Sequence, residues 1–141
     1  AMSFDLMVFD PGVAPRERAA FMQWYEQQTE WAEDHDYDDP AVASPALQRW
    51  FADMVQYFPP MNGPLADPDA DGPEVTDHCI GRHVISSAFA WPVAKQAHAR
   101  MRELAILHGV GFFHASDLHG ELLFPDLPPS PARKRPWWRF W

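Results

Sequence analysis

The chain has 141 residues, of which 47% are hydrophobic and 14% aromatic, and its formal net charge is −9. This length and apolar content predict one folded domain and exclude an intrinsically disordered chain. Cys79 is the only cysteine, which excludes an intramolecular disulfide, and no apolar run is long enough for a transmembrane helix. We therefore expect a cytoplasmic protein.

The charge is divided unevenly along the chain. Residues 1–127 hold all twenty acidic residues and seven of the eleven basic ones, a net charge of −13, whereas residues 128–141 hold four basic residues and no acid. An acidic domain repels phosphate backbones and attracts basic proteins, so we expect no direct nucleic-acid binding. The sequence predicts a single α+β domain at 1–127 followed by a basic, tryptophan-rich tail at 128–141.

The first predicted elements are a strand and a helix. Residues 4–9 are apolar apart from Asp5 and end at Asp10-Pro11-Gly12, which predicts a strand closed by a turn. Aromatic residues then recur at helical spacing after Pro15, which suits a first helical turn. This pattern predicts a helix over about 15–34.

A second helix and a long loop follow. Ser44-Pro45 is a capping residue followed by a first-turn proline, and an apolar stripe continues from Leu47 to Phe58. Residues 59–74 contain five prolines together with Asn-Gly and Asp-Gly pairs, which predict a loop.

The second half of the chain predicts a hairpin, a helix and another hairpin. Residues 75–80 and 83–91 flank Gly81-Arg82, a spacing that favours a type II′ turn. Pro92 begins the next helix, and Gly109 is expected to end it in the left-handed conformation. Strands are then predicted at 110–115 and 121–124.

The resulting element order is β-α-α-β-β-α-β-β. If one of the first two helices and the last strand are left out, the order becomes β-α-β-β-α-β, which is the split β-α-β arrangement of ferredoxin-like sheets. We therefore predict a ferredoxin-like antiparallel sheet of strand order 5-4-1-3-2, with the helices packed on one face.

Acidic residues are concentrated near the end of the first predicted helix. Seven of the fourteen residues at 26–39 are acidic, and aromatic side chains lie among them. Acids at a helix C-terminus oppose the dipole, so helix stability does not explain them. The pattern fits either a solvated face or, with the 59–74 loop, a docking surface for a basic protein. The candidate partner-binding residues are Glu30, Trp31, Asp34, His35, Asp36, Tyr37, Asp38, Asp39, Met61 and Asn62.

The 59–74 loop contains part of a calcium-binding pattern. Asp67, Asp69, Asp71 and Gly72 match its first half, but His78 stands where a bidentate glutamate is needed. The three aspartates are therefore candidate metal ligands only in an alternative interpretation, a small enzyme or metal-binding domain that uses this loop or clustered histidines.

The histidines and the cysteine give no catalytic pattern. No histidine pair has the spacing of a zinc helix, and no nucleophile elbow or glycine-rich phosphate loop occurs. Several histidines would meet if the two hairpins lay side by side, and Cys79 is expected to be an inert thiol within a strand. We expect neither an enzyme nor a bound cofactor. The histidines considered are His78, His83, His98, His108, His114 and His119.

The tail combines cations with aromatic rings. In form it resembles short cationic tryptophan-rich peptides that bind at membrane interfaces. It also has two protein-bound alternatives, in which it docks on its own domain or on a second copy to give a homodimer. The residues expected to dock are Arg133, Arg135, Trp137, Trp138, Arg139 and Trp141.

Five segments carry a resemblance to a known family. They are Asp5–Pro11, Trp24–Trp31, Tyr37–Pro40, Phe58–Pro64 and Gly109–Phe113. These segments resemble a family of small, acidic bacterial proteins associated with toxin and immunity gene neighbourhoods, over about residues 3–125. The resemblance implies an immunity protein that blocks a basic toxin, and it brings no catalytic residues.

Overall fold

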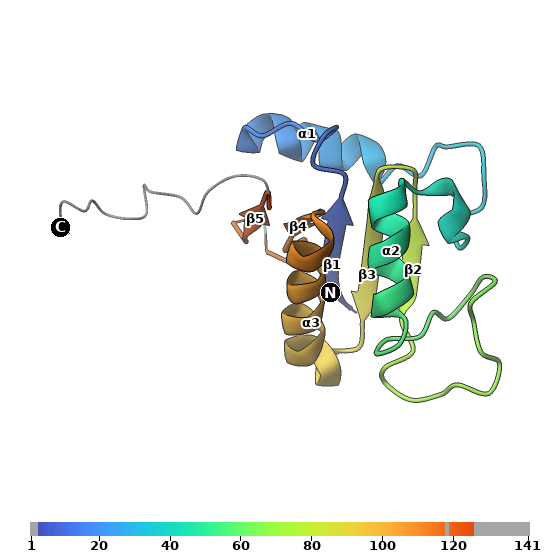
Figure 1. Cartoon of the computed structure of the whole chain (residues 1–141). Coiled ribbons are helices and arrows are strands. Elements are labelled where there is room, and N and C mark those ends of the chain that lie inside the picture. The colour runs from blue at the N-terminus through green and yellow to red at the C-terminus, as the bar shows by residue number, and fades with distance from the viewer. Residues whose placement is uncertain (1–2, 118, 126–141) are drawn as a thin grey trace.

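The first strand, β1 (Phe4–Phe9), is apolar on both of its faces. Side chains alternate along a strand, and here Leu6 and Val8 enter one core while Met7 and Phe9 enter a second. Both faces of the sheet therefore need a cover. The computed structural model describes residues 3–117 and 119–125, which form an α+β fold around this strand (Figure 1).

The described strands form one antiparallel sheet of five. Its members besides β1 are β2 (Asp77–Ile80), β3 (Val84–Phe89), β4 (Gly111–Phe113) and β5 (Leu122–Leu123). They lie in the order β2-β3-β1-β4-β5, which is β5-β4-β1-β3-β2 counted from the opposite edge. The predicted α+β class and the antiparallel pairing are confirmed.

One face of the sheet is covered by α2 (Pro45–Met54) and α3 (Ala94–His108). The apolar stripe predicted for the second helix is buried, and the indole N–H of Trp50 donates to the Met101 carbonyl at 3.4 Å, which joins the two helices. Gly109 ends α3 with a φ of 71°, so its predicted left-handed cap is confirmed. Short 3₁₀ turns at Pro40–Val42 and Trp91–Val93 precede the two helices.

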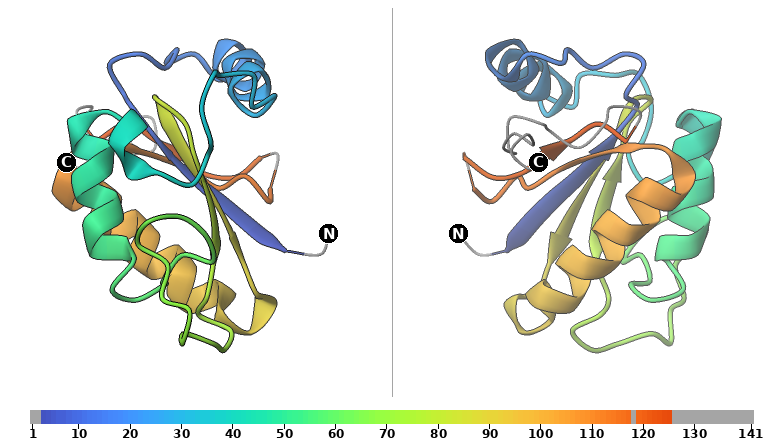
Figure 2. Two further views of the ribbon diagram at one scale, coloured as in Figure 1. Left: turned by 90° about the vertical axis from the view of Figure 1, so that its right-hand side faces the viewer. Right: turned by 60° about the vertical axis from the view of Figure 1, so that its left-hand side comes forward.

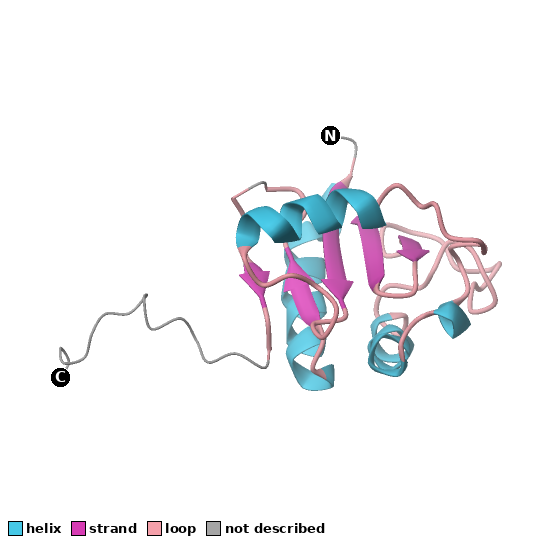
Figure 3. Ribbon diagram, turned by 90° about the horizontal axis from the view of Figure 1, so that it is seen from above, coloured by secondary structure: helices cyan, strands magenta, loops and turns pink. Residues whose placement is uncertain are grey.

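The opposite face is covered by α1 (Arg18–Gln28), whose Phe21 packs on Phe9 and Phe113. Figures 2 and 3 show α1 across the sheet from α2 and α3. The prediction that all helices pack on one face is therefore wrong. Helices cover both faces because β1 carries apolar side chains on each of them, and a strand with two buried faces requires a cover on each.

The first helix is also shorter than its predicted range of about 15–34. It begins after Glu17, whose carboxylate accepts hydrogen bonds from the N–H groups of Ala19 and Ala20 at 3.1 and 3.0 Å. It ends at Thr29, before the dense run of acids, which the negative end of a helix dipole disfavours. The helix therefore leaves residues 30–39 as an irregular segment.

The turn of the first hairpin differs from the prediction by one residue. Ile80 pairs with Ile85, and the Gly81 N–H donates to the Val84 carbonyl at 2.8 Å, so Arg82 and His83 form the turn. The type II′ turn is wrong, because its first residue needs a positive φ and Arg82 does not have one. Gly81 is instead buried beside the Glu33 carboxylate.

The predicted second hairpin and long loop are confirmed, whereas α2 ends at Met54, before Phe58, and α3 begins at Ala94, after a 3₁₀ turn that contains Pro92. β4 and β5 pair as the second hairpin, and residues 59–74 contain neither a helix nor a strand. The loop is closed at its base, where the Met61 N–H donates to the Thr76 carbonyl and the Thr76 N–H donates to the Pro59 carbonyl, each at 2.9 Å. The described residues contain no helix with the length and hydrophobicity that a membrane crossing requires.

Candidate functional site

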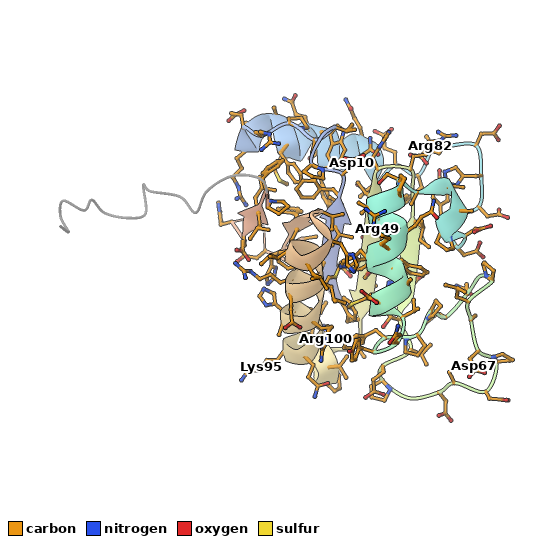
Figure 4. All side chains as sticks on the ribbon, viewed as in Figure 1. Asp10, Arg49, Asp67, Arg82, Lys95 and Arg100 are labelled. Carbon is orange, nitrogen blue, oxygen red and sulfur yellow. The ribbon has the colours of Figure 1, made fainter. Side chains whose placement is uncertain are left out.

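The predicted partner-binding segments lie on one side of the molecule. In Figure 1 the segment that follows α1 and the loop that follows α2 both lie on the β2 side of the sheet. Figure 4 places Asp67 in that loop, and Arg82 above it at the tip of the hairpin. Residues 30–39 and 59–74 therefore flank the same edge strand.

Residues 33–37 are held to the hairpin by a set of contacts that we call the Glu33 clasp, formed by Glu33, His35, Tyr37 and Arg82. The Glu33 carboxylate accepts a hydrogen bond from the Arg82 backbone N–H at 3.1 Å and contacts His35 Nε2. The Tyr37 hydroxyl accepts from the Glu33 N–H at 2.5 Å and donates to the Glu33 carbonyl at 3.0 Å. The Tyr37 carbonyl accepts from the Ile80 N–H at 2.8 Å. The segment is thus tied to β2 and to the turn.

The charges within the Glu33 clasp stabilise each other. Hydrogen bonding to the Asp36 carbonyl and to Glu33 raises the pKa of His35 above its usual value. Burial acts to raise the pKa of Glu33, but the hydrogen bonds from His35 and from the Arg82 N–H outweigh it and hold that pKa below its usual value. The ionised carboxylate and the protonated imidazole therefore coexist between these two pKa values.

Two further segments bind the same hairpin tip. The Arg82 carbonyl accepts from the Ser44 N–H at 3.1 Å, and the His83 carbonyl accepts from the Asp10 N–H at 2.9 Å. The turn therefore joins the segment after β1, the Glu33 clasp and the start of α2 through backbone groups, which fixes its position.

Trp31 adopts a conformation that is unusual for its residue type. Among the described residues it is the only non-glycine with a positive φ, at 53°. Its ring packs on Tyr37 with ring centres 5.2 Å apart and also borders the core under α1. A tryptophan in the left-handed region costs about 1–2 kcal/mol relative to glycine, so the packing of the ring offsets a strained backbone.

Gly63 joins the two predicted segments. It has a φ of 94°, and a Cβ at this position would lie 2.1 Å from the carbonyl oxygen of Asp38. Only glycine fits such an approach. The contact brings the loop that contains Met61 and Asn62 against the acidic segment at Asp38, and we call residues 30–39 and 61–63 together the acidic surface.

The ten candidate residues have different surroundings within this surface. Trp31, His35 and Tyr37 are partly buried, and the Asp39 carboxylate accepts from the Ala41 N–H at 2.9 Å. Asp38 is also partly buried, whereas the other candidate carboxylates are exposed, and in the described part of the chain no ion pair includes any of these four. The exposed residues of the surface are Glu30, Asp34, Asp36, Met61 and Asn62.

The calcium-like loop does not gather its aspartates. The Asp67 carboxylate accepts from the Asp69 N–H at 2.9 Å, which is a local turn contact. Among residues 3–117 and 119–125, no group of three or more histidine, cysteine or acidic side chains is arranged to hold a metal ion.

The histidines are dispersed, because β1 separates the two hairpins. His108 lies in the last turn of α3 and contacts Asp53 of α2 at 2.6 Å, and His83 lies at the hairpin tip, 3.7 Å from Asp10. His119 is exposed. Within the described residues, one pair of histidines is in mutual ring contact, His98 and His114, with ring centres 5.3 Å apart.

His78 belongs to the core. Its Nε2–H donates to the Phe58 carbonyl at 3.0 Å, and its Nδ1 accepts from the Ser87 hydroxyl at 2.7 Å. Burial lowers the pKa of His78 to about 4, so the ring is neutral at pH 7. Burial, together with Asp77, also raises the pKa of the Cys79 thiol to about 11, which leaves little reactive thiolate at neutral pH.

Three residues of the site were not among the predicted ones: Glu33, Gly63 and Arg82. Glu33 looked the same as its acidic neighbours, and nothing local distinguishes the one that turns inward. The turn signals Asn62-Gly63 and Gly81-Arg82 were visible, but each predicts a bend and not a distant contact.

The predicted docking residues at 133–141 lie outside the described residues.

No family model matches the chain, and no curated protein or solved structure matches it.

Proposed function

We propose that this chain is a cytoplasmic protein-binding domain that captures a basic partner on the surface formed by residues 30–39 and 61–63. The apposition of Gly63 and Asp38 carries the proposal, because it makes one surface from two segments that are separate in sequence. The Glu33 clasp supports it by holding the acidic segment in one shape before a partner arrives, which reduces the entropy lost on binding.

The charge distribution indicates which partner would be favoured. Residues 26–39 and 67–77 hold twelve of the twenty acids, and no lysine or arginine occurs between Arg18 and Arg49 or between Arg49 and Arg82. A concentrated negative surface accelerates encounter with a basic protein and repels acidic ones. Such association would weaken as salt concentration rises.

Apolar side chains beside the acids supply possible anchors. Met61 and Leu65 of the long loop are 53% and 48% exposed. Binding energy concentrates in apolar anchors surrounded by a polar rim, and Met61 belongs to the loop whose Gly63 contacts Asp38 of the acidic segment. The surface therefore favours a partner that offers both cations and an apolar or aromatic side chain.

We further propose that the partner is a bacterial toxin and that this chain is its immunity protein. The support is the family resemblance of residues 3–125 together with the acidic surface. A basic toxin whose active site is occupied by this surface would be inhibited without any catalysis by the chain.

The test is a binding measurement with charge reversals. The partner is captured from a lysate of the source cells, identified by mass spectrometry, purified and titrated by calorimetry. Asp34→Lys with Asp36→Lys should weaken binding about tenfold or more, as expected for interfacial charges. Glu103→Lys with Asp117→Lys changes the total charge equally at exposed positions on other elements and should have little effect. Equal losses in the two variants would contradict the proposed surface.

For the tail, we propose a docking role for residues 128–141 on this domain or on a second copy, with membrane attachment as the competing role. The charge difference between the two parts of the chain supports docking. Removal of 128–141 should lower the melting temperature or abolish a dimer in sedimentation. Loss of binding to anionic liposomes with neither change would favour the membrane role.

We also interpret the sheet as ferredoxin-like, with α2 and α3 as its two crossover helices and α1 as an addition on the other face. The order β2-β3-β1-β4, with α2 and α3 together on one face, supports this interpretation. An experimental structure with a different strand order would contradict it.

A further inference from the structure

A hollow of about 330 Å³ lies away from the acidic surface. It is lined by Phe4 of β1, by Ala94, Lys95 and His98 at the start of α3, and by His114 after β4. In Figure 4, Lys95 and Asp67 are on opposite sides of the molecule. The hollow is therefore separate from the proposed partner-binding surface.

The walls of the hollow are aromatic rings. The rings of His98 and His114 are 5.3 Å apart, and the Phe4 ring meets His114 edge-on at 5.3 Å. His98 also packs edge-on against Phe112 beneath it, at 5.5 Å. Such ring edges and faces suit a flat apolar group by offset or edge-to-face contact.

The charge at the hollow is positive, which is unusual in a domain with a net charge of −13. Lys95 is exposed, and within the described residues it has no ion pair. Glu121, whose charge acts on His98, is paired, since Arg102 Nε and Nη2 donate to its two oxygens at 2.7 and 2.8 Å. Lys95 therefore remains an unpaired cation beside two imidazoles.

The helix end adds to this positive character. The first turn of α3 contains no acidic side chain, and its N-cap residue, Val93, makes no side-chain hydrogen bond to the helix. No side chain of the first turn or of the N-cap residue therefore offsets the partial positive charge of the helix N-terminus. Lys95 and His98, three residues apart, project from this turn on one side of the helix.

The imidazoles are sensitive to a neighbouring negative charge. Burial, and then the charge of His114, lowers the pKa of His98 below its usual value, while Glu121 acts to raise it and Arg102 to lower it. These groups, with Lys95, are the charged and titratable groups that face His98 from α3 and the β4–β5 hairpin, and β1 contributes the Phe4 ring. An anion in the hollow would favour the protonated imidazole.

We propose that this hollow binds a small organic anion, a carboxylate or phosphate attached to a flat ring, with its oxygens held by Lys95, His98 and His114. The ring lies against Phe4 and the imidazole faces. Binding takes up a proton at His98, so affinity rises as the pH falls from 8 to 6. The site does not depend on the acidic surface and is tested separately.

The experiment follows the imidazole resonances of the full chain by NMR, with benzoate and phenyl phosphate as probes. Both probes should give saturable shifts at His98 and His114, with tighter binding at pH 6 than at pH 8. His35 in the Glu33 clasp and His108 at the far end of α3, which contacts Asp53, should not shift. Equal shifts at all four histidines, or no saturation at His98 and His114, would overturn the proposal.

Two further probes separate the ring from the charge. Inorganic phosphate carries the charge alone and benzamide carries the ring alone, and each should bind at least tenfold more weakly than phenyl phosphate or benzoate. If inorganic phosphate binds as tightly as phenyl phosphate, the flat ring is not recognised. If benzamide binds as tightly as benzoate, the anion is not recognised. Either result would overturn the proposal as stated.

Variants of the exposed lysine provide the structural control. Lys95→Met retains the aliphatic stem and should weaken benzoate binding about tenfold, as expected for loss of a hydrogen bond to a charged group. Arg49→Met removes an exposed cation from α2 and should leave binding unchanged. His98→Gln should weaken binding and remove its pH dependence. If His98→Gln does not fold, the comparison of Lys95→Met with Arg49→Met decides, and equal affinities in these two variants would overturn the proposal.

Discussion

Two histidine contacts of opposite character lie at the β2–β3 hairpin. Within β2, His78 is buried and neutral, bonded to the Ser87 hydroxyl of β3 and to the Phe58 backbone carbonyl. At the tip of the hairpin, His35 lies near the surface and pairs with the Glu33 carboxylate. The first contact excludes charge and belongs to the core, whereas the second depends on charge and shapes the acidic surface.

The two contacts respond to pH in opposite directions. The pKa of His78 is lower in the folded chain than in the unfolded chain, so its contribution to stability is present above pH 6.5 and is lost as the pH falls toward 4. The pKa of His35 is raised by folding, so its contribution is present below pH 6.5 and is lost as the pH rises through the folded value. The core and the surface can therefore be weakened separately.

Breaking the buried contact should have the largest effect. The difference between about 4 and 6.5 in the pKa of His78 corresponds to about 3 kcal/mol of unfolding free energy. His78→Phe should be less stable than the wild type at pH 7, because two polar groups lose their partner, and the gap should close by about 3 kcal/mol toward pH 4. Urea unfolding at several pH values measures this difference in unfolding free energy between the variant and the wild type. A gap between His78→Phe and the wild type that stays constant from pH 7 to pH 4 would refute the assignment.

Disturbing the contact between Gly63 and Asp38, which joins the two surface segments, should cause the second-largest loss of stability. Gly63→Ala adds a strained backbone and a clash with the Asp38 carbonyl, whereas Gly109→Ala adds only the strain, since no atom lies within 4 Å of its Cβ position. Overpacking typically costs about 1–3 kcal/mol, so Gly63→Ala should be destabilised by about 2 kcal/mol more than Gly109→Ala. Denaturant unfolding compares them. Equal losses would mean that the two segments are not in contact.

Loosening the clasp should have a smaller effect on stability. Glu33→Gln removes the charge but keeps an acceptor for the Arg82 N–H, so we expect a loss of about 1 kcal/mol at pH 6. The pKa of His35, followed by NMR, should fall toward its usual value. Glu30→Gln removes an exposed acid nearby and should leave that pKa almost unchanged. An unaltered pKa in Glu33→Gln would show that the pair does not form in solution.

Replacing the strained residue Trp31 should give the smallest difference in stability, and the structure predicts the sign of that difference. Glycine is ordinarily less stable than alanine by about 0.5–1 kcal/mol in regular structure. At position 31 the order should reverse, because the positive φ of Trp31 suits glycine and strains alanine. Trp31→Gly should therefore be more stable than Trp31→Ala by about 1 kcal/mol in thermal unfolding. The ordinary order would contradict the left-handed conformation.

Elements marked by signals within one segment could be predicted from the sequence. Ser44-Pro45 and the stripe that follows define α2, and Gly109 marks the end of α3, because caps and periodicity act over a few residues. The side of the sheet that α1 covers was missed, although the continuous apolar run of β1 contained that information.

Contacts within the candidate site depend on residues far apart in sequence. Glu33 and Arg82 are in contact although they are 49 positions apart in the sequence, and α2 lies in the chain between Asp38 and Gly63. The sequence indicated residues 30–39 and the 59–74 loop as candidate segments, because they are rich in acids, aromatic rings and turn residues. It did not indicate which acid would turn inward, because that choice depends on a backbone N–H supplied by the hairpin.

The bridge at the base of the 59–74 loop has a practical consequence. Because Pro59, Met61 and Thr76 bring the two ends of the loop together by backbone hydrogen bonds, the chain between them can be opened without separating α2 from β2. Exposed loops of this kind accept new chain termini, inserted domains and protease sites. A cleavage site placed at residues 67–71 would turn the chain into two associated fragments and would show whether a bound partner protects that loop.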